Sequence, residues 1–256
     1  MTVVQAIGDG IRRVHRAPAI LLGIWALMSL VRPPGGPTTP AIDPFLDVHR
    51  SAVASSDAMA YAVVWLFLSG GIVDRYARDR ATRAYGFFGA SGGFFFRFLR
   101  LAFLFATVYW LFGALVTPLT RDTGNAIFGG LVAVCALVVD YAQVRAVVED
   151  RRSVIGAIGA GVRFIRHAPA AFVLYGLDLA LLLLLRAGYA TVAPSARGFW
   201  FGLAIGQGYV VARLWLRLVF WASETALFQS RFAHAGYVAA PEAVWPESPA
   251  AEAFRS

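Results

Sequence analysis

Apolar residues follow one another in long runs along most of this chain, and shorter polar segments separate the runs. A helix needs about 20 consecutive apolar residues, with a range of about 17–25, to cross a bilayer. Because only helices and closed barrels satisfy their backbone hydrogen bonds in lipid, the runs predict an all-α integral membrane protein. We expect six transmembrane helices, at 17–32, 57–74, 98–118, 126–146, 170–190 and 199–222.

The polar segments complete the predicted layout. The connectors at 119–125 and 191–198 are short, so we expect the third and fourth runs, and the fifth and sixth, to form antiparallel hairpins. Proline and glycine punctuate the longer connector at 33–57. We therefore expect one membrane domain over 1–235 and a disordered cytoplasmic tail over 236–256.

The first run also has the outline of a secretory signal peptide. Arg12, Arg13 and Arg16 precede the apolar residues 18–31, as the basic region of a signal peptide precedes its apolar region. The run is followed by Arg32 and two prolines rather than by a small-residue cleavage site. Retention as a helix is the favoured interpretation, and a cleaved signal peptide is the alternative.

One segment of the sequence is repeated. Residues 6–19 read AIGDGIRRVHRAPA and residues 157–170 read AIGAGVRFIRHAPA, with eight of fourteen positions identical. A weaker copy, GASGGFFFRFLRLA, occupies 89–102. An acidic residue closes the second, fourth and sixth runs, at Asp74, Asp140 and Glu224. The pattern predicts three repeats, each made of an amphipathic segment, an outward span and an inward span.

The repeated segment has the composition of a helix that lies in the membrane interface. Its arginines would face lipid phosphates while its apolar side chains enter the lipid. Pro18 and Pro169 stand at the start of the following runs, and the first turn of a helix tolerates proline. The arginines expected to face lipid are Arg12, Arg97, Arg100, Arg163 and Arg166.

The order of these features also resembles known families. The segment 138–170, VVDYAQVRAVVEDRRSVIGAIGAGVRFIRHAPA, joins an acidic span end, an Arg-rich linker and an amphipathic segment. This layout resembles uncharacterised six-span bacterial membrane protein families, including the membrane domain appended to some glycerophosphodiester phosphodiesterases. The resemblance implies an all-helical inner-membrane protein and supplies no catalytic residues.

Composition places the charges relative to the membrane. The chain is 59% hydrophobic, and all 23 basic residues are arginine. If the runs are spans, sixteen arginines lie on the side of the termini and five on the opposite side. The positive-inside rule then puts both termini in the cytoplasm of a bacterial inner membrane. Because the arginines gather at the ends of apolar runs, the net charge of +8 indicates contact with membrane lipids and not with nucleic acid.

A few charges fall inside the runs, where each costs at least ~2.5–3.5 kcal/mol. Counted from the 191–198 connector, Asp178 lies about 14 residues inward and Arg213 about 16, so both lie roughly 21–24 Å from the turn. This matching depth predicts an Asp178–Arg213 pair. Arg217 is one turn further along, and we expect it to reach Glu224, Asp140 or the lipid head groups.

Catalytic and metal-binding patterns are weak. GASGG at 89–93 matches G-x-S-x-G, and His234 is a tempting partner, but the motif needs a strand–turn–helix setting. The repeat also aligns Ser91 with Ala157, so the position does not demand a hydroxyl. The four histidines lack the spacing of a metal site. We expect no catalytic residues, no metal and no cofactor.

Two functions remain open at this point. The favoured one is a non-enzymatic multispan membrane protein that acts as a subunit or scaffold of a membrane complex, with a possible protein partner, or in lipid organisation. In that case the intramembrane charges form a structural ion pair. The alternative is a transporter-like protein for an anionic or amphipathic solute, in which the charges on the fifth and sixth spans bind the solute or relay protons or ions. An intramembrane enzyme ranks third.

Overall fold

The computed structural model describes residues 1–31, 56–79, 82–116, 121–150, 153–193 and 198–231, and these residues form helices and the short turns between them. The all-α prediction is confirmed for this part of the chain. The predicted tail and nearly all of the 33–57 connector lie outside it. The helices are α1 (Val3–His15), α2 (Pro18–Val31), α3 (Ser56–Arg78), α4 (Ala84–Val116), α5 (Arg121–Val148), α6 (Val154–His167), α7 (Ala170–Val192) and α8 (Phe199–Arg231).

Four helices of the described residues are long and apolar enough to cross a membrane: α4, Ile127–Val148 of α5, α7 and α8. They coincide with the last four expected spans, so the membrane character of the chain is confirmed and the count of six is not reached. With 14 residues, α2 is only about 21 Å long against a hydrocarbon core of about 30 Å. The described side chains of α3 include Asp74, Arg75 and Arg78, which lower its hydropathy.

We expected the weaker copy of the repeated segment to form a separate interfacial helix, and it does not. It lies within α4, which continues without a break from residue 84 to residue 116. The helical structure is interrupted after α1, immediately before Pro18, and after α6, at Pro169. Phe103, the residue directly after the weaker copy, occupies the place that corresponds to Pro169. Proline lacks an amide hydrogen and clashes with the preceding turn, so its absence lets α4 run on.

Each repeated segment packs along one of three central helices. The first half of α4 lies on α3, α6 lies on α5, and α1 lies on α8. The three central helices α3, α5 and α8 also contact one another. The largest fully buried side chains come from this junction, among them Trp221, Tyr76, Tyr141, Phe98 and Phe220.

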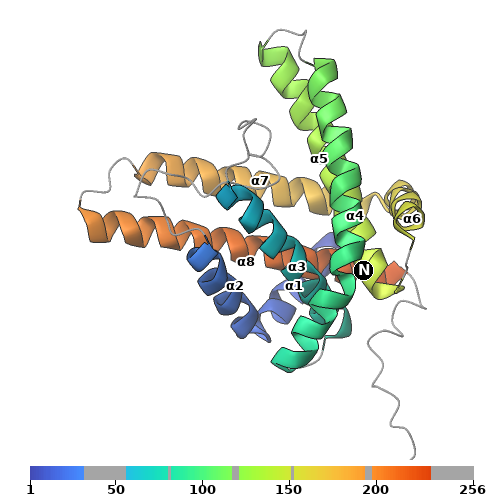
Figure 1. Cartoon of the computed structure of the whole chain (residues 1–256), viewed down its shortest axis with the longest axis horizontal. Coiled ribbons are helices and arrows are strands. Elements are labelled where there is room, and N and C mark those ends of the chain that lie inside the picture. The colour runs from blue at the N-terminus through green and yellow to red at the C-terminus, as the bar shows by residue number, and fades with distance from the viewer. Residues whose placement is uncertain (32–55, 80–81, 117–120, 151–152, 194–197, 232–256) are drawn as a thin grey trace, which may run out of the picture.

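Two hairpins extend away from the junction. In Figure 1 the α4–α5 hairpin (green) points to the top of the view and the α7–α8 hairpin (orange) points to the left. Both predicted hairpins are therefore present as neighbouring helices. Their outer surfaces are apolar, with Trp110 74% exposed on α4 and Leu184 67% exposed on α7. The core of the molecule thus lies at the junction, and the hairpins present apolar side chains outward.

Candidate functional site

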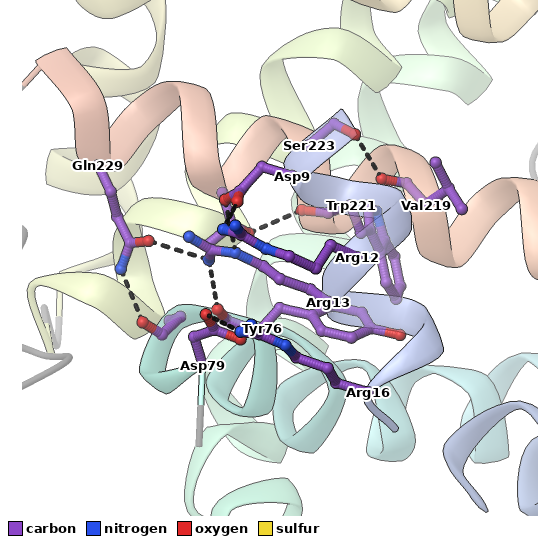
Figure 2. A network of polar contacts seen from close by, with 12 residues as sticks. Asp9, Arg12, Arg13, Arg16, Tyr76, Asp79, Val219, Trp221, Ser223 and Gln229 are labelled. Carbon is purple, nitrogen blue, oxygen red and sulfur yellow. Dashed lines mark hydrogen bonds and ion pairs between the residues drawn. The ribbon is translucent and has the colours of Figure 1, made fainter. Parts of the chain in front are cut away.

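One buried arginine connects three helices where α1 crosses the ends of α3 and α8. Nη1 of Arg13 donates to the backbone carbonyl of Tyr76 at 2.5 Å and to Oε1 of Gln229 at 3.1 Å, and Nε donates to Oδ2 of Asp9 at 3.0 Å (Figure 2). The last carbonyls of a helix have no partner within the helix. Arg13 satisfies one of them on α3 with a charge-assisted hydrogen bond. We call these four residues the Arg13 clasp.

Two further ion pairs join arginines of the repeated segments to the points where α3 and α5 end. Asp79 and Asp150 have φ angles of 44° and 48°, a left-handed conformation that aspartate tolerates better than most residues. Arg16 pairs with Asp79 at 3.2 Å, and Arg97 pairs with Asp150 at 2.6 Å. These arginines therefore hold the chain reversals that follow the two central helices.

The arginines predicted to face lipid fall into two groups. Arg100, Arg163 and Arg166 are exposed, and the side chain of Arg12 is 56% exposed although it also pairs with Asp9. Arg97 is different, because its side chain is only 21% exposed and is bound to Asp150 as described above. Four of the five arginines thus remain at the surface, where lipid phosphates can contact them.

A second polar group lies among α5, α7 and α8. Nη2 of Arg217 on α8 donates to Oδ1 of Asp140 on α5 at 2.6 Å, and its Nη1 donates to Oδ2 of Asp178 on α7 at 3.4 Å. Asp140 and Asp178 are 2% and 6% exposed. Glu224, seven residues further along α8, interacts electrostatically with all three. We call Asp140, Asp178, Arg217 and Glu224 the intramembrane charge cluster.

An aromatic side chain supports the cluster from the same helix. Trp221 lies four residues after Arg217, which places the two side chains on one face of α8. The guanidinium of Arg217 lies 5.0 Å from the centre of the Trp221 ring, within the range of a cation–π contact. Nε1 of Trp221 donates to Oδ1 of Asp140 at 3.2 Å. Arg217 and Trp221 therefore present two donors to the same carboxylate oxygen.

Several polar atoms of the cluster have no hydrogen-bond partner. They are both carboxyl oxygens of Glu224, Oδ2 of Asp140 and the hydroxyl of the neighbouring Tyr141. Glu224 and Tyr141 are fully buried. Buried polar groups in proteins are nearly always hydrogen-bonded, so an unpartnered group needs a physical explanation. Three carboxyl groups surround one guanidinium here, so the cluster contains more acid than base.

The structure brings together four of the five predicted cluster residues. The partner of Arg217 is Asp140, one of the three expected possibilities, and Arg217 also contacts Asp178. Arg213 is half-buried one turn away and has an interaction of its own within the described chain. The predicted Asp178–Arg213 pair stays a prediction.

Sequence reasoning missed the Arg13 clasp, the supporting role of Trp221 and the unpartnered hydroxyl of Tyr141 beside the cluster. For Trp221 a signal was present, because Arg and Trp four residues apart on a helix are neighbours. Tyr141 directly follows Asp140, so its nearness to the cluster follows from the sequence. No comparable signal existed for Arg13. Its partner Gln229 lies 216 residues away, and only the packing of α1 on α8 brings the two together.

The described residues contain no group of His, Cys, Asp and Glu side chains arranged to hold a metal ion. Ser91 is fully buried, and its hydroxyl has no hydrogen-bond partner. It lies against Gly71 on α3, a small-residue contact between helices. His234 lies outside the described residues. The polar atoms of the charge cluster are thus the ones whose geometry suggests chemistry, and this chemistry is ion pairing and proton binding.

Comparison with known proteins gave no match to any protein family, curated protein or solved structure. The resemblance to six-span bacterial membrane families therefore stays a prediction.

Proposed function

We propose that this chain is a bacterial inner-membrane protein without catalytic activity that acts as a subunit or scaffold of a membrane complex or in lipid organisation. The observation that carries this proposal is the exposed apolar surface of the two hairpins shown in Figure 1, with side chains such as Trp110 and Leu184 facing outward. Helix faces without a covering neighbour are filled in a membrane by lipid or by helices of another protein. Arg13, Arg16 and Arg97, by contrast, are bound to residues of the chain itself.

The proposal includes six spans in three repeats, with α2 and α3 as the first two. The packing supports it, since each repeated segment lies on the central helix of the preceding repeat, and α1 on α8 joins the first repeat to the third. The Arg16–Asp79 and Arg97–Asp150 pairs link the first two segments to the ends of the central helices of their own repeats, and Phe164 of the third segment contacts Phe228 on α8. Each repeated segment would thus bridge two repeats.

Both termini lie in the cytoplasm in this proposal, because most arginines lie on the same side of the expected spans as the termini. Fusions to alkaline phosphatase, which is active only outside the cytoplasm, and to a green fluorescent protein test the orientation. A fusion at the C-terminus should fluoresce and lack phosphatase activity. A fusion within the 119–125 connector is the matched control and should behave in the opposite way. Phosphatase activity at the C-terminus would reverse the orientation.

A photo-crosslinking side chain tests the scaffold function. We would place it at Trp110, which is exposed on α4, and as a control at Leu101, which is buried on the same helix. In native membranes Trp110 should give one discrete protein adduct if the chain is a complex subunit. The crosslinker at Trp110 should give adducts with lipid if the chain organises lipid. Leu101 should give only adducts within the chain. Equal, unselective adducts at both sites would overturn the proposal.

One observation favours a second candidate, a transporter-like protein. The intramembrane charge cluster contains a fully buried carboxyl group without a hydrogen bond, and buried ionisable groups in membrane proteins often mark ion pathways. The cluster has more acid than base, so it suits a cation or a proton better than the anionic solute expected from the sequence. Solute uptake into proteoliposomes that is lost in Asp140→Asn would support this candidate.

A further inference from the structure

Three acidic residues occupy the corresponding place in the three repeats, and their bonding differs. Asp74 on α3 accepts hydrogen bonds from Nε of Arg78 at 2.9 and 3.0 Å. Asp140 on α5 accepts from the two donors of α8 described above. Glu224 on α8 is 0% exposed, and neither of its carboxyl oxygens has a partner. Glu224 is therefore the acid that cannot be explained as half of an ion pair.

The surroundings of Glu224 are unfavourable for a negative charge. The groups that interact with it electrostatically are, from α5, Asp140 and Tyr141, from α7, Tyr175 and Asp178, and from α8 itself, Arg217. Among the described residues, α1, α2, α3 and α6 contribute none of these groups. Arg217, the positive charge that interacts with Glu224, already faces two carboxylates, so an ionised Glu224 would be a third negative charge beside it. A buried carboxylate without hydrogen bonds is disfavoured by desolvation as well.

We propose that Glu224 holds an exchangeable proton at neutral pH, which makes the intramembrane charge cluster a buried proton-binding site. A protonated carboxyl is neutral, which removes the excess negative charge of the cluster, and it is also a hydrogen-bond donor. This proposal does not rest on the scaffold function, because the site needs no partner protein. It would give the second candidate a specific ion, the proton.

Two unused groups on α5 fit the proton-binding site. Oδ2 of Asp140 has no donor, and the Tyr141 hydroxyl has no partner. A carboxylate oxygen accepts a hydrogen bond, and a hydroxyl both donates and accepts, so both groups are available to bind a proton, and neither is hydrogen-bonded to Glu224. A metal cation fits less well, because the guanidinium of Arg217 already binds Asp140 and Asp178.

Arg217 connects α8 to both α5 and α7 within the cluster. The Arg217–Asp178 distance of 3.4 Å is longer than the Arg217–Asp140 distance of 2.6 Å, so the contact with α7 is the weaker one. An ionised Glu224 attracts the same guanidinium. Arg217 is thus the positive charge that interacts with Asp140, Asp178 and Glu224 together.

Infrared spectroscopy of the purified full chain in lipid nanodiscs tests the site. A protonated carboxylic acid has a C=O stretching band separate from that of a carboxylate. At neutral pH we expect this band in the native protein and its loss in Glu224→Gln. Glu149→Gln is the matched control, since Glu149 is ion-paired with Arg145 at 2.9 Å. The band should persist in this variant.

Two further measurements keep the result interpretable. Transfer to D2O should shift the band, because an exchangeable proton is replaced by deuterium. A band that does not shift would mean that the proton does not exchange, and this result would overturn the proposal. Tyr141→Phe retains the Glu224 carboxyl and should keep the band, because the Tyr141 hydroxyl is not hydrogen-bonded to Glu224. The proposal is also overturned if the native protein lacks the band at neutral pH, or if Glu149→Gln removes it.

Discussion

Helices α1 and α6 carry the two closely related copies of the repeated segment, and they pack differently. Gly10 of α1 lies against the backbone of α8, where an added Cβ would be 2.6 Å from the carbonyl oxygen of Val219 and 2.9 Å from the amide nitrogen of Ser223. The equivalent Gly161 of α6 lies against α5, and its added Cβ would be no closer than 3.4 Å to Ala142. The same glycine is a steric requirement in α1 and an ordinary contact in α6.

The two helices also bury different side chains at one repeat position. In α1 the position is Arg13, whose guanidinium binds α3 and α8 in the clasp. In α6 it is Phe164, whose ring lies 5.0 Å from the ring of Tyr141 and 5.1 Å from that of Phe228. A shared segment therefore sets where each helix lies, and the facing helices decide whether the contact is polar or aromatic.

The largest effect should come from Gly10→Ala. Its Cβ would overlap backbone atoms of α8, which cannot move as a side chain can, and overpacking typically costs about 1–3 kcal/mol and occasionally more. The single cysteine, Cys135, is half-buried on α5, so the temperature dependence of its labelling by a thiol reagent reports unfolding. Gly8→Ala is the control, because nothing lies within 4 Å of its Cβ. Equal stability of the two variants would contradict the close approach.

A smaller effect should follow from Arg13→Met, which keeps the length of the side chain and removes its charge. The variant leaves the carbonyl of Tyr76 and the amide oxygen of Gln229 without this donor. Hydrogen bonds to charged groups contribute about 1.5–3 kcal/mol, so we expect a loss of that order in the same Cys135 assay. Arg12→Met, at an exposed position of the same helix, should change stability by no more than about 0.5 kcal/mol. Similar losses of stability in both variants would show that the Arg13 clasp does not stabilise the fold.

The smallest effect should come from Gly161→Ala. The new methyl group meets α5 at ordinary van der Waals distance, and alanine favours a helix by roughly 0.5–1 kcal/mol over glycine. We therefore expect unchanged or slightly raised stability, close to that of Gly159→Ala, whose Cβ meets nothing within 4 Å. A loss as large as that of Gly10→Ala would remove the difference between α1 and α6.

Much of the helical layout follows from particular residues. The last four apolar runs coincide with α4, α5, α7 and α8 because a bilayer requires long apolar helices. The breaks at Pro18 and Pro169, and the unbroken α4 through Phe103, follow from proline alone, although the continuity of α4 was not predicted. The first two runs are harder to assign as membrane spans from the sequence, because α2 is short and α3 ends in charged residues.

The sequence by itself determined the class of the protein, because hydropathy and proline act through the backbone of each helix separately. It also determined which charges are costly, since Asp140, Asp178, Arg213 and Arg217 lie within the expected spans and Glu224 follows the last of them. Only the tertiary structure decided how these charges bond. Depth along a helix does not define its rotation or its neighbours, and Arg217 met Asp140 from α5 because α5 and α8 share the central junction. The same packing left Glu224 buried without a partner.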